Sequence, residues 1–422
     1  MIPVTAVDGV SERELLSQFK ARSGEVDRQV TATVLEIMQA VRLKGDAAVM
    51  EYTKKFDGRV PEKTEITPDE MRDALQSNNP DFVSALQKAA ENIRDFHERQ
   101  KQQSWLNTLK SGSLLGQRVR GLKRVGIYVP GGTAAYPSSV LMNAIPAKIA
   151  GVEEIIMVTP PFKDGKANPD ILAAAAIAGV DRVFLVGGAQ AVAALAYGTA
   201  TVPAVDKIVG PGNIYVATAK KLLFGTVDID MIAGPSEILI IADETANPSF
   251  IAADLMSQAE HDILASAVLI TTSEDIAEKT RQELSFQVER LSRKEIIKKS
   301  LADYGAILLC GTIAQAIDLS NEFAPEHLEL CVKNPLEYLA SIDNAGSVFL
   351  GDYAPESLGD YFAGPNHVLP TGGTARFFSP LSVDSFVKKS SFIYYTRQDL
   401  NAAAGDIMTL ANAEGLTAHA NS

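Results

Sequence analysis

The sequence predicts an α/β protein built from two similar, doubly wound units. From residue 116 to about residue 351, short apolar runs alternate with alanine-rich or amphipathic segments. This alternation predicts parallel strands joined by helical crossovers, because a strand buried on both faces reads as a continuous apolar run. The alternation occurs twice, which suggests a duplicated unit. A chain of 422 residues also has room for two or three domains.

The chain before the first strand has a helical pattern. Residues 11–110 are rich in charge, and their apolar residues recur at spacings of three and four. Thr67 and Pro68 are typical of a helix start, as N-cap and first helical residue. His97 lies in the charged run NIRDFHERQ and is expected on a solvated face. We therefore expect a helical region over residues 1–115, and its packing against the second unit is one arrangement left open.

The first α/β unit is expected over residues 116–236. Glycine turns follow several of its apolar runs, as in RVGIYVPGG and RVFLVGG. Its strands are expected at 124–132, 153–159, 182–188 and 207–212, and its helices at 140–151 and 171–179.

The second unit is expected over residues 237–375, with a tail after it. Its alternation is weaker and its helices are longer. The tail, residues 376–422, is expected as an appended segment rather than a third sheet. The strands of the second unit are expected at 238–243, 266–272, 306–312, 327–332 and 345–351.

Bulk composition narrows the class of protein. A formal net charge of −13 argues against a nucleic-acid partner, which normally requires a basic surface. Two cysteines, Cys310 and Cys331, cannot form a disulfide framework, and a reducing, cytoplasmic setting is expected. No secretory signal is visible at the N-terminus.

Residues 183–205 are uncharged and long enough to span a bilayer, but the Gly187-Gly188 pair interrupts them. A strand, a turn and a helix explain them better, so no membrane contact is expected.

Two glycine junctions could hold a nucleotide. The usual G-x-G-x-x-G pattern does not follow the first strand. The runs GPGNIYVATAK (210–220) and GGAQAVAALA (187–196) each place glycines between a strand and a helix, where backbone N–H groups can face a phosphate. Turn glycines are common in this position, so both interpretations remain open.

Several polar residues could carry chemistry. Gln258 and His261 are three apart and would share one helix face, as half of a metal site or as an ordinary polar patch. Glutamine is a poor metal ligand. Glu326 and His327 follow a proline and would lie at the start of an element, either as a cap and a packed side chain or as a proton-transfer pair.

Two further candidates lie in the last third of the chain. Asp360 and His367 share a loop rich in glycine and proline, a kind of segment that often carries function. His419 lies three residues from the end, where a side chain is usually frayed. On local grounds alone, neither Asp360 nor His419 is assigned a role.

Taken together, these motifs resemble the histidinol dehydrogenase family. The segment DMIAGPSEILIIADETANPSFIAADLMSQAEH (230–261) matches the signature of that family along its whole length. The resemblance covers nearly the entire chain. Val227, where many members carry isoleucine, is a conservative departure. The other matching runs are VGIYVPGG, GPGN, FAPEHLEL, GDYFAGPNHVLPT and EGLTAHA.

The resemblance implies an activity and a set of site residues. The family oxidises L-histidinol to L-histidine through L-histidinaldehyde, with two NAD, one water and a bound zinc, as the last step of histidine biosynthesis. Glu326 and His327 would be the acid–base pair. The zinc ligands would be Gln258, His261, Asp360 and His419. Substrate contacts would come from these four and from Ser236, His327, His367 and Glu414, and NAD contacts from Tyr128, Gln190 and Asn213.

The resemblance also implies an assembly. Members have two incomplete Rossmann-like units, here 116–236 on the NAD side and 237–375 on the zinc and catalytic side. They form homodimers that exchange their C-terminal tails. Glu414 and His419 would therefore complete the site of the neighbouring subunit.

Three other functions remain alternatives to this activity. A paralogous zinc and NAD dehydrogenase would act on another amino alcohol or diol. A non-catalytic nucleotide-binding module would need neither the Glu326–His327 pair nor a metal. A zinc hydrolase would turn over without NAD.

Overall fold

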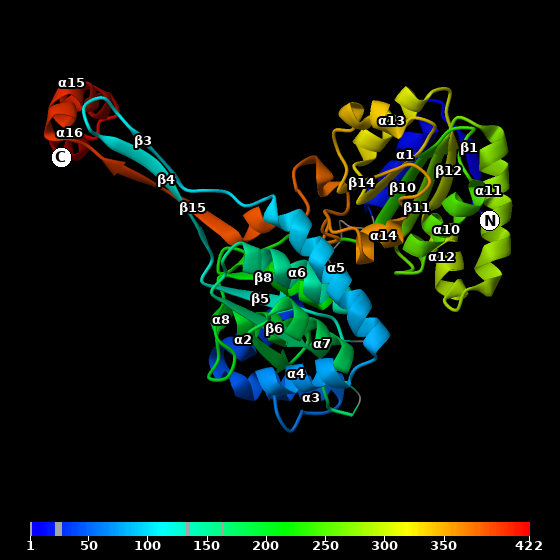
Figure 1. The fold of residues 1–422 in the computed structure, drawn as a ribbon, viewed down its shortest axis with the longest axis horizontal. Coiled ribbons are helices and arrows are strands. Elements are labelled where there is room, and N and C mark those ends of the chain that lie inside the picture. The colour runs from blue at the N-terminus through cyan, green and yellow to red at the C-terminus, as the bar shows by residue number, and fades with distance from the viewer. Residues whose placement is uncertain (1, 22–27, 132–135, 163) are drawn as a thin grey trace.

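The computed structural model describes residues 2–21, 28–131, 136–162 and 164–422. Two α/β units lie next to each other, and a narrow arm extends away from them (Figure 1). Each unit contains a six-stranded sheet, and the arm is a three-stranded sheet that ends in two helices.

The first unit is built on a sheet of order β2-β7-β6-β5-β8-β9. All neighbours are parallel except β2 and β7, which are antiparallel. Helices cover both faces of this sheet, α4 to α7 on one face and α2, α3, α8 and α9 on the other. The strands are β2 (Glu65–Ile66), β5 (Arg124–Tyr128), β6 (Glu154–Thr159), β7 (Arg182–Leu185), β8 (Lys207–Val209) and β9 (Asp228–Ile229). The helices are α2 (Arg28–Lys44), α3 (Asp46–Asp57), α4 (Pro68–Ser77), α5 (Pro80–Glu98), α6 (Pro137–Ile149), α7 (Pro169–Ala178), α8 (Gly188–Tyr197) and α9 (Ile214–Leu223).

The second unit is built on a fully parallel sheet of order β1-β12-β11-β10-β13-β14. Helices α10 to α12 cover one face, and α1 and α13 cover the other. The strands are β1 (Val4–Ala6), β10 (Glu237–Ala242), β11 (Ser266–Thr271), β12 (Gly305–Leu309), β13 (His327–Cys331) and β14 (Ser347–Leu350). The helices are α1 (Ser11–Ala21), α10 (Pro248–Ala259), α11 (Glu274–Gln287), α12 (Lys294–Tyr304), α13 (Ile313–Phe323) and the short α14 (Glu356–Tyr361).

The two sheets share one strand order. In each, the first strand of the alternation lies in the middle, the next two follow on one side and the last two on the other. The chain therefore changes sides between β5 and β8 and again between β10 and β13, and such switch points are where doubly wound sheets bind ligands. Every strand expected from 124–132 to 345–351 is confirmed. Gly132 of the first expected turn lies outside the described residues.

Two local expectations from the sequence also hold: the helix start at Thr67, and a strand, a turn and a helix in the uncharged run 183–205. Thr67 caps α4 in a capping box with Glu70. In the part of the chain that is described, no helix is both long and apolar enough to span a bilayer. The uncharged run 183–205 contains most of β7 and all of α8.

The expected N-terminal region, residues 1–115, is divided between the two units, so the packing against the second unit that was left open holds, among its described elements, for β1 and α1 alone. Its β1 pairs with β12, and Phe19 of α1 is buried against the second sheet. Its α2 to α5 pack on the first sheet, where Ile37 and Ile93 are among the largest fully buried side chains. The apolar stripes seen in the sequence are thus divided between two cores, because each helix buries its stripe against the nearest uncovered sheet face.

The expectation of a tail without a sheet is wrong. β15 (Val387–Tyr394) pairs antiparallel with β4 (Leu114–Gly121), and β3 (Trp105–Thr108) pairs with β4 on its other side. This third sheet forms the arm, and α15 (Arg397–Ala413) and α16 (Thr417–Asn421) lie at its tip (Figure 1). Most of β15 is exposed, so its sequence lacks the apolar run that marks a buried strand.

The expectation for His97 is also wrong. His97 is fully buried at the end of α5, and its Nδ1 lies 2.8 Å from the carbonyl oxygen of Ile93. Asn366, in the loop before His367, lies 3.4 Å from the other ring nitrogen. The charged residues around His97 occupy the solvent side of the helix, while the imidazole points to the loop that helps form the site.

Candidate active site

A cavity of about 390 Å³ brings together the expected chemistry-bearing residues of the second unit. It is also lined by the glycine run Gly210-Pro211-Gly212 of the first unit, so both units contribute to it. The expected residues that line it are Ser236, Gln258, His261, Glu326, His327, Asp360 and His367.

The Glu326–His327 pair lies at the start of β13. β13 pairs with β10, and His327 stands beside Ile238 in the register. Ser236, the residue before β10, is therefore close to the pair, and the backbone N–H of Glu237 donates to Oε2 of Glu326 at 3.0 Å. The second unit thus presents the amino ends of its two central strands to the cavity, whereas the first unit presents the carboxyl ends of β5 and β8.

Gln258 and His261 are near neighbours, but they do not share a helix. α10 ends at Ala259, so Gln258 lies in its last turn and His261 in the turn beyond it. The His261 backbone N–H donates to the carbonyl oxygen of Gln258 at 3.2 Å. The expected i, i+3 helix pair is therefore corrected to a pair at a helix end, with Gln258 buried and His261 exposed to the cavity.

Asp360 is on a helix rather than in a loop. The short α14 includes it, and Gly359 beside it leaves room for the ring of Phe349, which a Cβ at that position would approach to 2.6 Å. The loop after α14 turns back so that Nδ1 of His367 lies 2.9 Å from the carbonyl oxygen of Asp360. Asp360 Oδ1 lies 3.7 Å from Nε2 of His327.

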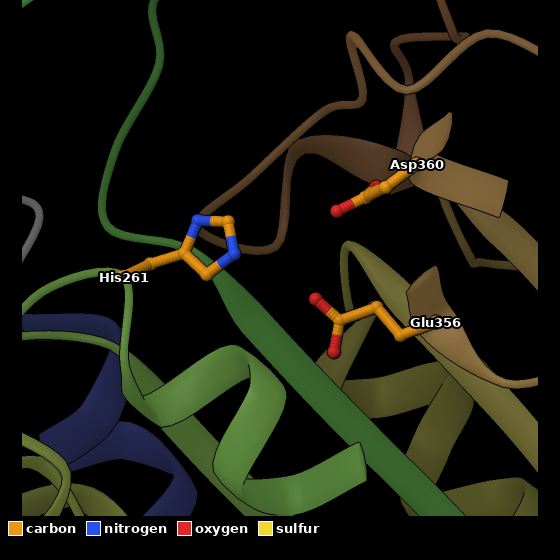
Figure 2. A group of neighbouring side chains, drawn as sticks. All are labelled: His261, Glu356 and Asp360. Carbon is orange, nitrogen blue, oxygen red and sulfur yellow. The ribbon is translucent and has the colours of Figure 1, made fainter. Parts of the chain in front are cut away.

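Three side chains could hold a metal ion: His261 and Asp360 of this cavity, and the buried Glu356 beside them. One ligand atom from each of His261, Glu356 and Asp360 lies within 4.8 Å of the others. Figure 2 shows both carboxylates pointing toward the imidazole. Glu356 was missed in the sequence, where it lies between a proline and a serine. Its spacing of four from Asp360 was the available signal, because such a pair shares one face of a helix.

The Gln258 amide is oriented by its neighbours. When the amide is assigned with its nitrogen toward these neighbours, that nitrogen lies 2.9 Å from Nδ1 of His327, 3.2 Å from Oε1 of Glu356 and 3.2 Å from the carbonyl oxygen of Glu237. A carboxylate and a carbonyl only accept hydrogen bonds, so the amide N–H groups must face them. The amide oxygen consequently faces away from these acceptors, as the ligand role expected for Gln258 requires.

The site is rich in buried acid. Burial raises the pKa of Glu326. Burial, together with the nearby carboxylates, raises the pKa of Glu356 well above its usual value. Burial alone would lower the pKa of His327, but Glu326, Asp360 and Glu356 together raise it to about 10. The pocket therefore stabilises positive charge. A divalent cation beside Asp360 would supply such charge and favour the neutral imidazole that a general base requires.

A second, larger cavity of about 970 Å³ lies at the carboxyl ends of the first sheet. Tyr128, Gln190 and Asn213, the three residues expected near NAD, all line it. Both amide atoms of Gln190 are buried and without a hydrogen-bond partner among the described residues. Buried polar groups are normally paired, so this amide fits a polar ligand such as a dinucleotide.

Two glycines with positive φ lie at these cavities, Gly188 at the larger one and Gly210 at the smaller one. Gly188 has a φ of +66°, and its N–H donates to the Tyr128 hydroxyl at 3.0 Å. Gly210 has a φ of +107°, and a Cβ there would lie 2.2 Å from the carbonyl oxygen of Tyr128. Asn213 lines both cavities, which places the larger one directly beside the Glu326–His327 site.

Two expected site residues are not brought to the cavity of their own chain. Glu414 and His419 are exposed at the tip of the arm, beside α15 and on α16. The arm carries them away from both units (Figure 1). Within one chain, the candidate metal site therefore lacks the fourth ligand that the resemblance implies.

Comparison with known proteins gives one consistent match. The family model for histidinol dehydrogenase matches residues 20–422. The chain is 58% identical over 416 residues to the histidinol dehydrogenase of Clostridium acetobutylicum, covering 98% of this chain and 96% of that protein. It is 56% identical over 405 residues to the histidinol dehydrogenase of Geobacter sulfurreducens, covering 95% of this chain and 94% of that protein.

A solved structure agrees with the sequence matches. The crystal structure of histidinol dehydrogenase from Elizabethkingia anophelis superposes with a TM-score of 0.93 at 39% identity, covering 100% of this chain and 96% of that one. Its mixed α/β architecture with parallel sheets is the architecture described above. The chain belongs to the histidinol dehydrogenase family, whose members are NAD-dependent oxidoreductases of the last step of histidine biosynthesis.

Proposed function

We propose that this protein oxidises L-histidinol to L-histidine through L-histidinaldehyde, consuming two NAD and one water per substrate. The observation that carries the proposal is the meeting of two cavities. One contains the Glu326–His327 pair and the expected zinc ligands Gln258, His261 and Asp360. The other, beside it, contains the amide of Gln190, which has no hydrogen-bond partner among the described residues. An alcohol dehydrogenase needs a proton acceptor, a bound cofactor and a fixed substrate in contact, and this geometry supports all three.

His327 and Glu326 divide the proton transfers. His327 accepts the proton of the histidinol hydroxyl while the carbon loses a hydride. Glu326 then takes a proton from water, whose hydroxide adds to the aldehyde carbon, while His327 returns its proton to the carbonyl oxygen, which gives the gem-diol. Glu326 passes its own proton to solvent. His327 accepts a proton again as the gem-diol loses the second hydride and becomes the carboxylic acid. NAD, when bound, is the acceptor of both hydrides, and we assign its binding to Tyr128, Gln190 and Asn213 of the first unit, residues 116–236.

Zinc is the metal we assign to the second unit, residues 237–375. Gln258, His261 and Asp360 would bind it from one subunit, and His419 of the partner subunit would complete the set. Imidazole and carboxylate are ordinary zinc ligands. The metal, when bound, supplies a positive centre that orients the imidazole and amine of the substrate. Ser236 and His367 line the same cavity and would contact the substrate.

The fourth ligand requires an exchanged homodimer. Within the expected tail, residues 376–422, Leu381 and Phe386 stay in the core of the first unit and residues 387–422 leave the body as part of the arm, so Glu414 and His419 reach no site of their own chain. The arm also exposes apolar side chains that a second subunit would cover, with Ile393 73% and Leu410 68% exposed. We therefore infer that two chains swap arms and that each arm completes the partner's site. A cytoplasmic location, expected from the sequence, fits two buried and unpaired cysteines.

Removing the metal should abolish NADH formation and leave NAD binding intact. The reason is that zinc orients histidinol, while the dinucleotide cavity is lined by other residues. The measurement is NADH formation with L-histidinol before and after chelation, together with NAD binding by calorimetry. Adding back one Zn²⁺ per subunit should restore the rate. Unchanged turnover in protein freed of metal would exclude a zinc-dependent reaction, and equal rates with histidinol and a small diol would favour the paralogous activity.

A further inference from the structure

The proposed reaction leaves one buried carboxylate beside the metal site without a role. Glu356 is the first residue of α14 and is fully buried. Its Oε2 has no hydrogen-bond partner among the residues that the structure describes. A buried carboxylate is costly unless hydrogen bonds or a cation compensate it, so its presence calls for an explanation.

The side chain of Glu356 is held firmly in place. α14 packs against α10, the helix that carries Gln258. Two further acids of the second unit, Asp254 and the buried Glu329, are hydrogen-bonded to each other and face the backbone of Glu356. The ring of Phe349 fills the space over Gly359 on the other side of the helix. The backbone at the start of α14 is therefore fixed next to α10, which keeps the buried Glu356 beside Gln258.

Glu356 contacts the side-chain amide of Gln258, which can adopt two orientations. A glutamine side chain can turn by half a rotation with almost no change in shape, which exchanges its oxygen and its nitrogen. Only the oxygen can bind a cation. Oε1 of Glu356 accepts from the amide nitrogen at 3.2 Å, which favours the orientation in which the amide oxygen points elsewhere.

We propose that Glu356 is a positioning residue for the metal: it holds the nitrogen of the Gln258 amide and so turns the amide oxygen toward the cation. The inference rests on the zinc site proposed above. It explains how a weak amide ligand can serve in a metal site, because an outer-shell hydrogen bond fixes the ligand before the metal arrives. It also links the metal to the base, since the same amide nitrogen lies 2.9 Å from Nδ1 of His327.

The test compares Zn²⁺ affinity across four variants of the full-length protein, by competition with a chromophoric chelator. Glu356→Ala removes the acceptor and should weaken zinc binding by about 10- to 100-fold, the usual loss for an outer-shell partner. Glu356→Gln keeps a carbonyl oxygen that can accept from Gln258 and should recover most of that loss. Gln258→Ala removes the ligand itself. In that background, adding Glu356→Ala should cost little more, because the residue acts through the amide.

A spectroscopic readout separates positioning from general damage. In protein loaded with Co²⁺, Glu356→Ala and Gln258→Ala should shift the visible d–d bands in the same direction, because both lose the oriented amide oxygen. Glu12→Ala is the matched control: Glu12 is also buried, but its carboxylate accepts from the backbone N–H groups of Asp8 and Gly9. This control should lower thermal stability without changing zinc affinity or the spectrum.

Three results would overturn the inference or its foundation. Wild-type zinc affinity in Glu356→Ala would show that the carboxylate has no role. Equal losses in Glu356→Gln and Glu356→Ala, additive with Gln258→Ala, would make Glu356 a direct ligand instead. A wild-type protein that binds no zinc would refute the metal site, and the inference with it, before any variant is compared.

Discussion

Replacing His327 with asparagine should lower the turnover number for L-histidinol by about 10²- to 10⁴-fold, the range expected when a general base is removed. His327 is only 4% exposed and lines the cavity, so bulk water cannot readily take its place. Asparagine keeps a polar atom near the position of Nδ1, which faces the Gln258 amide and the carbonyl of Glu237. It cannot accept the proton of the alcohol. The measurement is the rate of NADH formation at saturating histidinol and NAD.

The same variant carries its own control. His327 is not among the proposed zinc ligands, so His327→Asn should bind zinc and NAD like the parent protein. A large loss of turnover with both ligands still bound would locate the defect in proton transfer. An unchanged turnover number would remove His327 from the reaction and leave Glu326 as the only candidate base of the pair.

Mixing two inactive variants should restore activity if the arms are exchanged. His419→Asn loses the ligand that the arm carries, and His327→Asn loses the base that the body carries, so each homodimer should be almost inactive. In a mixed dimer, one site combines the intact body of the first variant with the intact arm of the second. A random mixture should then regain about one quarter of the parent activity, since half of the dimers are mixed and each has one complete site.

The control for this experiment is each variant taken alone through the same co-expression and purification. Neither should gain activity. If co-expressed mixtures stay as inactive as the separate variants, the sites are not shared between subunits, and His419 must then be excluded as a ligand. Sedimentation should also show a dimer, because the exposed apolar side chains of the arm, such as Ile393 and Leu410, need a partner surface.

The parallel strands were predictable because burial leaves a direct mark on the sequence. All six residues of β10 are buried, and its run EILIIA shows no alternation. The arm was not predictable for the same reason. Seven of the eight residues of β15 are exposed, so the strand carries no burial pattern, and its partner β4 is far away in the chain. Pairing between distant, exposed strands leaves no local signal.

The site was only partly predictable. Gln258, His261, Glu326, His327 and Asp360 were expected from motifs, and the structure brings all five to one cavity. The burial of His97 and the presence of Glu356 were missed. A charged helix face conceals a single inward-facing imidazole, and a glutamate after a proline reads as a loop residue. The burial of His97 and the position of Glu356 both depend on which segment of the chain packs against their helices. A single sequence does not show that packing.

The amount of NADH formed per L-histidinol consumed tests the proposed four-electron oxidation most directly. With limiting histidinol and excess NAD, the purified protein should form two NADH and one histidine for each substrate molecule, because His327 and Glu326 serve an alcohol oxidation, a hydration and an aldehyde oxidation in one site. A yield of one NADH with release of the aldehyde would contradict the proposed four-electron reaction and leave a simple alcohol dehydrogenase.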